Sequence, residues 1–152
     1  AAWLASLVGA PGADGADGDD GADGPPALCI VSLQVTGIGA TGDPLAVGDG
    51  QAALLISSSY TGKNLVDALA AVTTTSSSGD ITIQLRRARG GVNMLSTPIT
   101  ILAGQTASTG GGATQPVVDA ANDDVVAGDV IYIDVDGAGT GAKGLLVTME
   151  FA

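Results

Sequence analysis

A glycine at every third position from Gly9 to Gly24 is the feature that most constrains this chain. Residues 9–26 read GAPGADGADGDDGADGPP, and the repeating glycines are Gly9, Gly12, Gly15, Gly18, Gly21 and Gly24. A triple helix of three extended chains requires this unbroken period, because only glycine fits at its crowded axis. A flexible Gly-rich linker, the alternative interpretation, has no need of a fixed period. We therefore predict a short triple-helical stalk over residues 9–26, which implies a homotrimer.

This collagen-like stalk carries 5 aspartates per chain and no Lys or Arg, so three chains bring like charges together. Proline, which preorganises the extended conformation, stands only in the first and last triplets. We therefore expect the domain that follows to trimerise and to hold the stalk. Calcium binding by the acidic run is an alternative, but the run lacks the ligand spacing and the closing Glu of an EF-hand loop. Diffuse counter-ion screening is the preferred interpretation.

Residues 1–8, before the repeat, include four apolar side chains at nearly helical spacing. These are Trp3, Leu4, Leu7 and Val8. We predict that residues 1–8 form an apolar attachment segment, which either docks onto a larger body or forms a small apolar plug.

The formal net charge of −11, with 5 basic residues and no histidine, limits the partners of the chain. Nucleic acids and anionic membranes attract basic surfaces, so neither is expected. No apolar run approaches the ~18 residues that span a bilayer, so membrane insertion is not expected either. The single cysteine, Cys29, is predicted to be a buried, unreactive side chain because no histidine is present to activate it.

Residues 27–152 are predicted to form one all-β domain, because apolar and polar residues alternate between turn-rich stretches. The clearest strands lie in ALCIVSLQVT, DITIQLRRAR, STPITILAG, GDVIYIDVDG and GLLVTMEFA. Further strands near 51–60, 92–95 and 115–119 bring the total to about eight, which fits a jelly-roll-like β-sandwich. The Gly-rich stretch DGAGTGAK is predicted to join the last two strands as a hairpin.

The segment 64–74 is ambiguous. Leu65, Leu69 and Val72 have helical spacing in an Ala-rich context, which favours a short helix. The β-branched run VTTT that follows, and the strands on both sides, favour a strand. We favour the strand.

Three stretches carry a resemblance to a known family. NMLSTPITILAGQTAS, VVDAANDDVVAGDVIYIDVDG and GAKGLLVTMEF, in this order near the C-terminus, resemble the C-terminal domains of tailed-bacteriophage fibre and appendage proteins, which often follow collagen-like repeats. The resemblance implies a homotrimeric fibre, head spike or decoration protein with a β-sandwich tip. It implies a location on the virion surface and a capsid or tail protein as partner.

The residues needed for catalysis are scarce, so we expect no enzyme activity and no cofactor. The chain has no histidine, no Cys-His pair and no phosphate-binding loop with its lysine. Asp134 with Asp136, and Asp123 with Asp124, are weak candidates for a metal site or for a pair of catalytic carboxylates. Paired aspartates beside strands are more often turn and cap residues, and we expect no metal site.

Arg86, Arg87 and Arg89 form a basic cluster in an acidic chain. Guanidinium groups bind carboxylates through parallel hydrogen bonds. The cluster either pairs with aspartates of its own or a neighbouring subunit at a trimer seam, or binds a carboxylate-bearing glycan or an acidic shell protein. We favour the pairing.

Two further functions stay open. Loops 37–50, 105–114 and 136–143 are candidates for a tip that recognises a receptor or a host-surface glycan, since loops commonly carry binding residues. A bacterial surface or spore-coat protein with a collagen-like stalk and a trimeric jelly-roll head is the other alternative.

Overall fold

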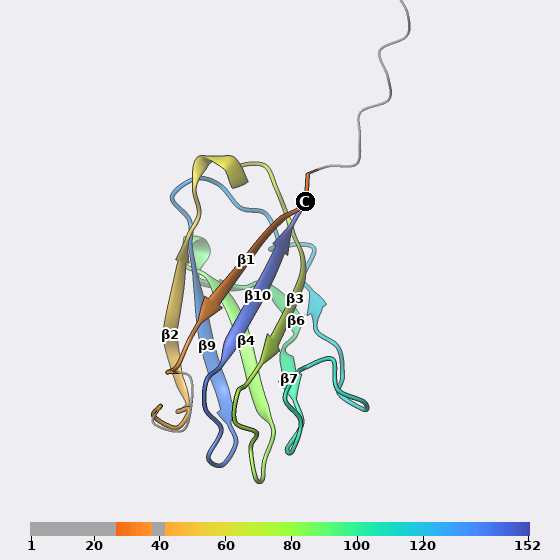
Figure 1. Cartoon of the computed structure of the whole chain (residues 1–152). Coiled ribbons are helices and arrows are strands. Elements are labelled where there is room, and N and C mark those ends of the chain that lie inside the picture. The colour runs from red at the N-terminus through yellow and green to blue at the C-terminus, as the bar shows by residue number, and fades with distance from the viewer. Residues whose placement is uncertain (1–26, 38–41) are drawn as a thin grey trace, which may run out of the picture.

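The computed structural model describes residues 27–37 and 42–152 (Figure 1). The predicted attachment segment 1–8 and stalk 9–26 lie outside the described residues, as do residues 38–41 of the first predicted loop. The described residues are all-β: they form strands, turns and two 3-10 helices, η1 (Ser58–Tyr60) and η2 (Arg89–Gly91), and include no α-helix. Within this part of the chain no helix is long and apolar enough to cross a membrane.

The strands form antiparallel sheets whose arrangement is consistent with a β-sandwich. One sheet has the order β1-β10-β3, with β1 (Cys29–Gln34), β10 (Leu146–Phe151) and β3 (Leu65–Ala71). The other has the order β2-β9-β4-β5, with β2 (Gly48–Leu55), β9 (Val130–Ala138), β4 (Ile81–Arg87) and β5 (Val92–Asn93); β7 (Ile99–Ile101) also pairs with β4. A small additional sheet joins β6 (Leu95–Thr97) to β8 (Val117–Val118).

The core lies where the inward faces of these strands meet. The alternation predicted from the sequence is found in β4, where Ile81, Ile83 and Leu85 are fully buried, and it recurs in β9 and β10. The other buried members from those two strands are Ile131, Ile133, Val135, Val147, Met149 and Phe151. Burial of apolar side chains of this size contributes about 1.5–3 kcal/mol each, so these strands supply much of the driving force for folding.

Segment 64–74 contains a strand, as we favoured, and no helix: β3 pairs with β10 over Leu65–Ala71. The strand expected near 51–60 is shifted. It begins at Gly48 and ends at Leu55, and the serine-rich stretch after it turns into η1. Ser57 makes this turn locally, because its carbonyl accepts the N–H of Tyr60 at 3.1 Å and its hydroxyl bonds that of Ser59 at 2.7 Å. Such local bonds compete with strand pairing.

The predicted hairpin between the last two strands is wrong. β9 pairs with β2 and β4, whereas β10 pairs with β1 and β3, so the chain changes sheets between them. The connecting loop is held by other loops. The Leu45 N–H donates to the carbonyl of Ala142 at 2.7 Å, and Thr74 forms an isolated bridge with Lys143.

One end of the domain carries the start of β1 and the C-terminus, and the other end is formed by loops (Figure 1). At the proximal end, which we define by Ala27, η1, residues 121–128 and Ala152, the described chain begins beside the C-terminus. Cys29 pairs with Phe151, and Lys63 Nζ donates to the Ala27 carbonyl at 2.5 Å. The distal end consists of loops 43–47, 73–80 and 139–145. The first strand therefore starts at the end opposite these loops.

Candidate functional site

The three arginines of the predicted cluster fall into two separate sites. In β4, Arg86 is opposite Tyr132 and Arg87 is opposite Ile131. Successive strand residues point to opposite faces, so Arg87 shares the inward face with buried Ile131, and Arg86 lies on the outer face. Arg89 follows in η2.

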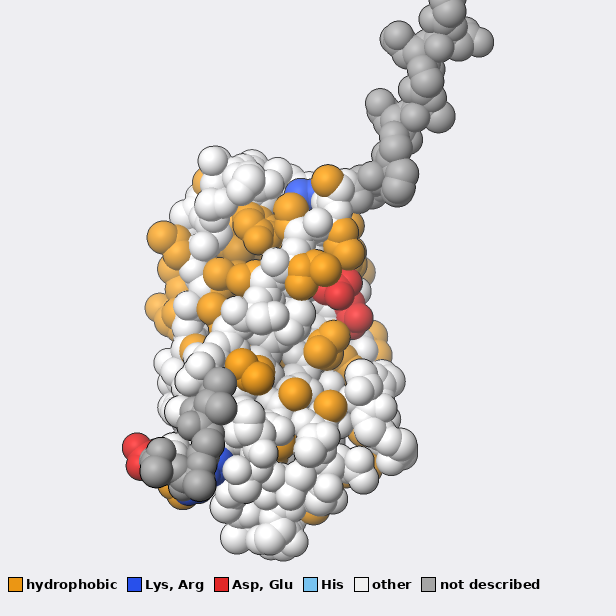
Figure 2. All heavy atoms as spheres, viewed as in Figure 1, with side chains coloured by type: hydrophobic (Ala, Val, Ile, Leu, Met, Phe, Trp, Pro, Cys, Tyr) orange, Lys and Arg blue, Asp and Glu red, His pale blue; other side chains and the backbone are white. Residues whose placement is uncertain are grey.

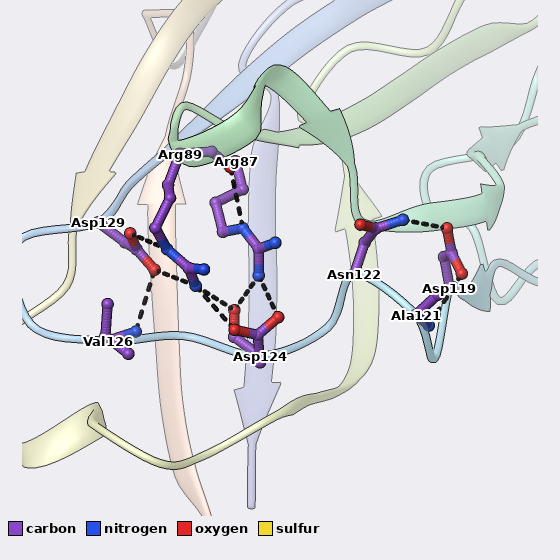
Figure 3. Close-up of polar contacts among 8 residues, drawn as sticks. All are labelled: Arg87, Arg89, Asp119, Ala121, Asn122, Asp124, Val126 and Asp129. Carbon is purple, nitrogen blue, oxygen red and sulfur yellow. Dashed lines mark hydrogen bonds and ion pairs between the residues drawn. The ribbon is translucent and has the colours of Figure 1, made fainter.

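Arg87 and Arg89 converge on two aspartates of the same chain, and we call this group the proximal clamp: Arg87, Arg89, Asp124 and Asp129 (Figure 3). Arg87 Nη1 contacts Asp124 Oδ1 at 2.5 Å, and Arg89 Nη2 contacts Asp124 Oδ2 at 2.8 Å. Arg89 also binds Asp129 through Nε at 2.8 Å and Nη2 at 3.0 Å. The clamp ties the end of β4 and η2 to the segment before β9.

Asp129 is the buried member of the proximal clamp. Its side chain is 4% exposed, and besides Arg89 it accepts the backbone N–H of Val126 at 3.0 Å. The guanidinium of Arg89 lowers the pKa of Asp129, and burial only partly opposes this. Arg89 and then Arg87 lower the pKa of Asp124 to about 2. Both carboxylates are thus held in the charged form at neutral pH.

The turn before the proximal clamp is ordered by a third carboxylate (Figure 3). Asp119 accepts the side-chain N–H of Asn122 at 2.7 Å and the backbone N–H of Ala121 at 3.1 Å. The Asn122 bond, followed by the Ala121 bond, lowers the pKa of Asp119. This Asx-type turn positions the following residues so that the Asp124 carboxylate can contact Arg87 and Arg89.

Arg86 forms a different group on the outer face of the second sheet. Its Nε and Nη2 donate to Asp134 at 2.6 and 3.1 Å, and its guanidinium lies 4.9 Å from the centre of the Tyr132 ring. The N–H of Gly50 donates to the same carboxylate at 2.6 Å. The hydrogen bond and charge of Asp134 raise the pKa of Arg86. Asp134, one of the metal candidates, is therefore occupied by donors.

Its proposed companion, Asp136, does not join Asp134 at a site. Asp136 is exposed and lies in an irregularity of β9, where Thr82 pairs with Gly137 and Ile83 with Val135. Partial desolvation, then the charges of Asp134 and Asp49, raise its pKa. Across the described ranges no group of three or more metal-binding side chains occurs. In the second candidate pair, Asp123 and Asp124, the Asp124 carboxylate is bound by Arg87 and Arg89 of the proximal clamp.

Cys29 lies on β1 and is partly rather than fully buried. Its side chain packs against the edge of the core. Full burial was expected, and the difference follows from its place: β1 is the edge strand of its sheet, so no further strand covers it on one side.

Two of the predicted tip loops meet at the distal end. The Leu45–Ala142 hydrogen bond joins loop 37–50 to loop 136–143, whereas loop 105–114 runs beside β3, where the Ser108 N–H donates to the Ala70 carbonyl at 2.9 Å. Ser76, which is 1% exposed, organises the distal loops by accepting the N–H of Thr140 at 2.9 Å. Most of the other polar groups there are neutral hydroxyls.

Sequence reasoning missed Asp129 and Ser76. Asp129 had one signal, because an aspartate just before an alternating strand is a common turn residue, but its arginine partner, Arg89, is 40 residues away in the chain. Ser76 is one of several serines in TTTSSSGD, and nothing local distinguishes the buried one.

No family model matches the chain, and no curated protein or solved structure is detectably similar to it.

Proposed function

We propose that the protein is a non-enzymatic structural component of a bacteriophage particle, displayed on the virion surface as a homotrimeric fibre, head spike or decoration protein. The observation that carries the proposal is the unbroken glycine repeat, which ends at Pro26 and is separated by two residues from β1 of an all-β domain. A triple helix whose own charges repel would need a neighbouring domain to hold its chains, and the all-β domain follows the repeat directly in the sequence.

The strand order supports a jelly-roll assignment for that domain. β1, β3 and β10 form one sheet and β2, β4 and β9 the other, so the chain crosses between sheets at most connections. Jelly rolls have this double-sheet organisation and recur in viral proteins. The sandwich would register the trimer and present a surface, while residues 1–8 attach to a capsid or tail protein.

The use of the charged side chains supports a structural rather than a catalytic role. Arg86, Arg87 and Arg89 each bond a carboxylate of the same chain. Catalytic groups are usually left accessible to a substrate, whereas these groups bond one another between distant segments. A carboxylate-bearing ligand would have to displace an aspartate from each guanidinium.

A receptor- or glycan-binding tip is the second candidate, and the position of the distal loops favours it. Loops 43–47, 73–80 and 139–145 lie at the opposite end from Ala27, where the stalk would join. A stalk would therefore hold these loops away from the particle. Binding of the whole protein to host cells, abolished by substitutions in these loops alone, is the result expected for this function.

The experiment that tests the proposed homotrimer compares the full chain with Gly15→Ala, which breaks the repeat, and with Ala16→Ser, which preserves it. Light scattering gives the mass, and circular dichroism reports the triple helix. We expect three times the 14.6 kDa chain mass for the full chain and for Ala16→Ser, with a triple-helix signal that only Gly15→Ala loses. Monomers without that signal at every concentration would contradict the proposal. The same chain recovered from purified virions would separate a phage component from a bacterial surface protein.

A further inference from the structure

The outer face of the sheet β1-β10-β3, which we call the β1 face, carries mostly uncharged side chains. The register places one row of outward residues across all three strands at each level. Its uncharged members include Ile30, Ser32, Leu69, Ala71, Leu146 and Thr148. Its only charged members on these strands are Asp67 and Glu150, which lie opposite each other. Ile30, Leu69, Ala71 and Leu146 are the apolar outward residues, at positions that are ordinarily polar in a solvent-facing antiparallel sheet.

Apolar side chains are exposed on and around the β1 face. Ile30 is 56% exposed on β1, and Leu28, just before β1, is 50% exposed. Val66, on β3, is 47% exposed. Figure 2 shows this side of the molecule: hydrophobic side chains are spread mainly over its upper half, and acidic ones appear on its right and at its lower left. Exposed apolar side chains that gather in one region are typical of interaction sites.

The stalk determines which layer of the domain lies nearest the axis of the proposed homotrimer. Only Ala27 and Leu28 separate Pro26 from Cys29, so β1 must begin within about 11 Å of the end of the stalk. Three stalk chains share one axis, which brings three copies of β1 close together. The second sheet of a sandwich lies about 10 Å farther away. The sheet that contains β1 is therefore the layer closest to its own copies.

We propose that the β1 face is the surface through which three copies of this chain associate, at the junction with the stalk. This inference rests on the proposed homotrimer and adds the contact surface to it. The occupant is a second copy of the chain, because a threefold stalk presents copies of this face to one another. Asp67 and Glu150 add like charges to such a contact, so the association depends on the apolar side chains of the face outweighing that repulsion.

The test places a lysine on the β1 face and, as a matched control, on the other sheet. Ile30→Lys and Leu55→Lys each replace a large apolar side chain that is more than half exposed on an edge strand, at 56% and 68% exposure. Thr148→Lys adds a second position at the centre of the β1 face. All are made in the full chain carrying Gly15→Ala, so that the stalk does not hold the chains together. Circular dichroism and thermal unfolding verify that each variant is folded.

We expect Ile30→Lys and Thr148→Lys to raise the chain concentration at half-dissociation at least about tenfold, and Leu55→Lys to change it by less than about twofold. If both folded β1-face variants keep the trimer at the concentrations of the parent, the β1 face is not the contact surface. If the unmodified chain is a trimer and the Gly15→Ala parent is a monomer, the stalk alone assembles the protein, which overturns this inference and leaves the homotrimer standing. If the unmodified chain is itself a monomer, the proposed homotrimer fails as well.

Discussion

Replacing Asp129 by Asn removes the buried charge of the proximal clamp and keeps the shape of the side chain. The carboxylate accepts three hydrogen bonds, from Arg89 Nε at 2.8 Å, Arg89 Nη2 at 3.0 Å and the Val126 N–H at 3.0 Å. An Asn side chain offers one oxygen, and its NH2 group must face a donor. Hydrogen bonds to charged groups contribute about 1.5–3 kcal/mol each. Arg89 is 44% exposed and keeps Asp124, so water recovers part of the loss, and we expect a destabilisation of about 2 kcal/mol.

The pH dependence of this effect has a definite sign. The pKa of Asp129 is below its ordinary value of 3.8, so folding favours its charged form. Its contribution is fully present above pH 3.8 and is lost as the pH falls through the lowered pKa. The difference in stability between wild type and Asp129→Asn should therefore be largest near neutral pH and should shrink below pH 3.8.

Urea unfolding followed by circular dichroism at pH 7, 5 and 3, at one fixed chain concentration, measures the difference. Asp136→Asn is the matched control, because its pKa is raised by desolvation and by Asp134 and Asp49. The folded state disfavours that charge, so its removal should leave stability at pH 7 equal to wild type or slightly higher. A loss below about 0.5 kcal/mol for Asp129→Asn at pH 7, or an equal loss at pH 7 and 3, would refute the structural role of the proximal clamp.

Two further substitutions probe the distal loops and the core. Gly139→Ala would place a Cβ 2.6 Å from Ser76 Cβ and 2.9 Å from the Gly79 carbonyl oxygen, whereas Gly141→Ala, also at positive φ, has nothing within 4 Å. We expect thermal unfolding to show Gly139→Ala less stable than Gly141→Ala by at least about 1 kcal/mol, and equal midpoints would contradict this packing. Phe151 is fully buried and packs edge-to-face on Tyr60 at 5.3 Å, so Phe151→Ala should cost about 3–5 kcal/mol in urea unfolding, and Phe151→Leu much less. Equal losses of stability for Phe151→Ala and Phe151→Leu would mean that the cavity left by the ring is not the cause of the destabilisation.

The strands of the core were predictable because their patterns are regular. The apolar residues Ile81, Ile83 and Leu85 alternate along β4, and Val147, Met149 and Phe151 alternate along β10. Segment 64–74 was ambiguous for a structural reason. A register shift between Glu150 and Phe151 leaves Val66 and Asp67 both exposed between buried Leu65 and Ala68. A bulge of this kind inserts an extra residue, so buried Leu65 and partly exposed Leu69 lie on opposite faces of β3, and their helix-like spacing of four does not reflect a shared face.

The connection between β9 and β10 was not predictable from the loop itself. A Gly-rich stretch permits a tight hairpin and equally permits a crossing between sheets. The choice depends on distant partners: β10 inserts between β1 and β3, and β9 between β2 and β4. The arginine partners were hidden for the same reason, since Asp124 and Asp134 lie 37 and 48 residues away from Arg87 and Arg86.

Because the arginines bond aspartates of their own chain, arginine ion pairs between subunits are not available to hold an assembly together. An arginine seam between subunits was one way for an acidic chain to associate, but Arg86, Arg87 and Arg89 already bond Asp134, Asp124 and Asp129 of their own chain. Moving these arginines to a neighbour would leave a buried carboxylate unpaired, which is strongly unfavourable. In the proposed homotrimer, association of chains with a net charge of −11 would then depend on apolar contact that outweighs repulsion. Salt screens repulsion and leaves apolar contact in place, so a trimer built this way should strengthen with salt, whereas an arginine seam would weaken.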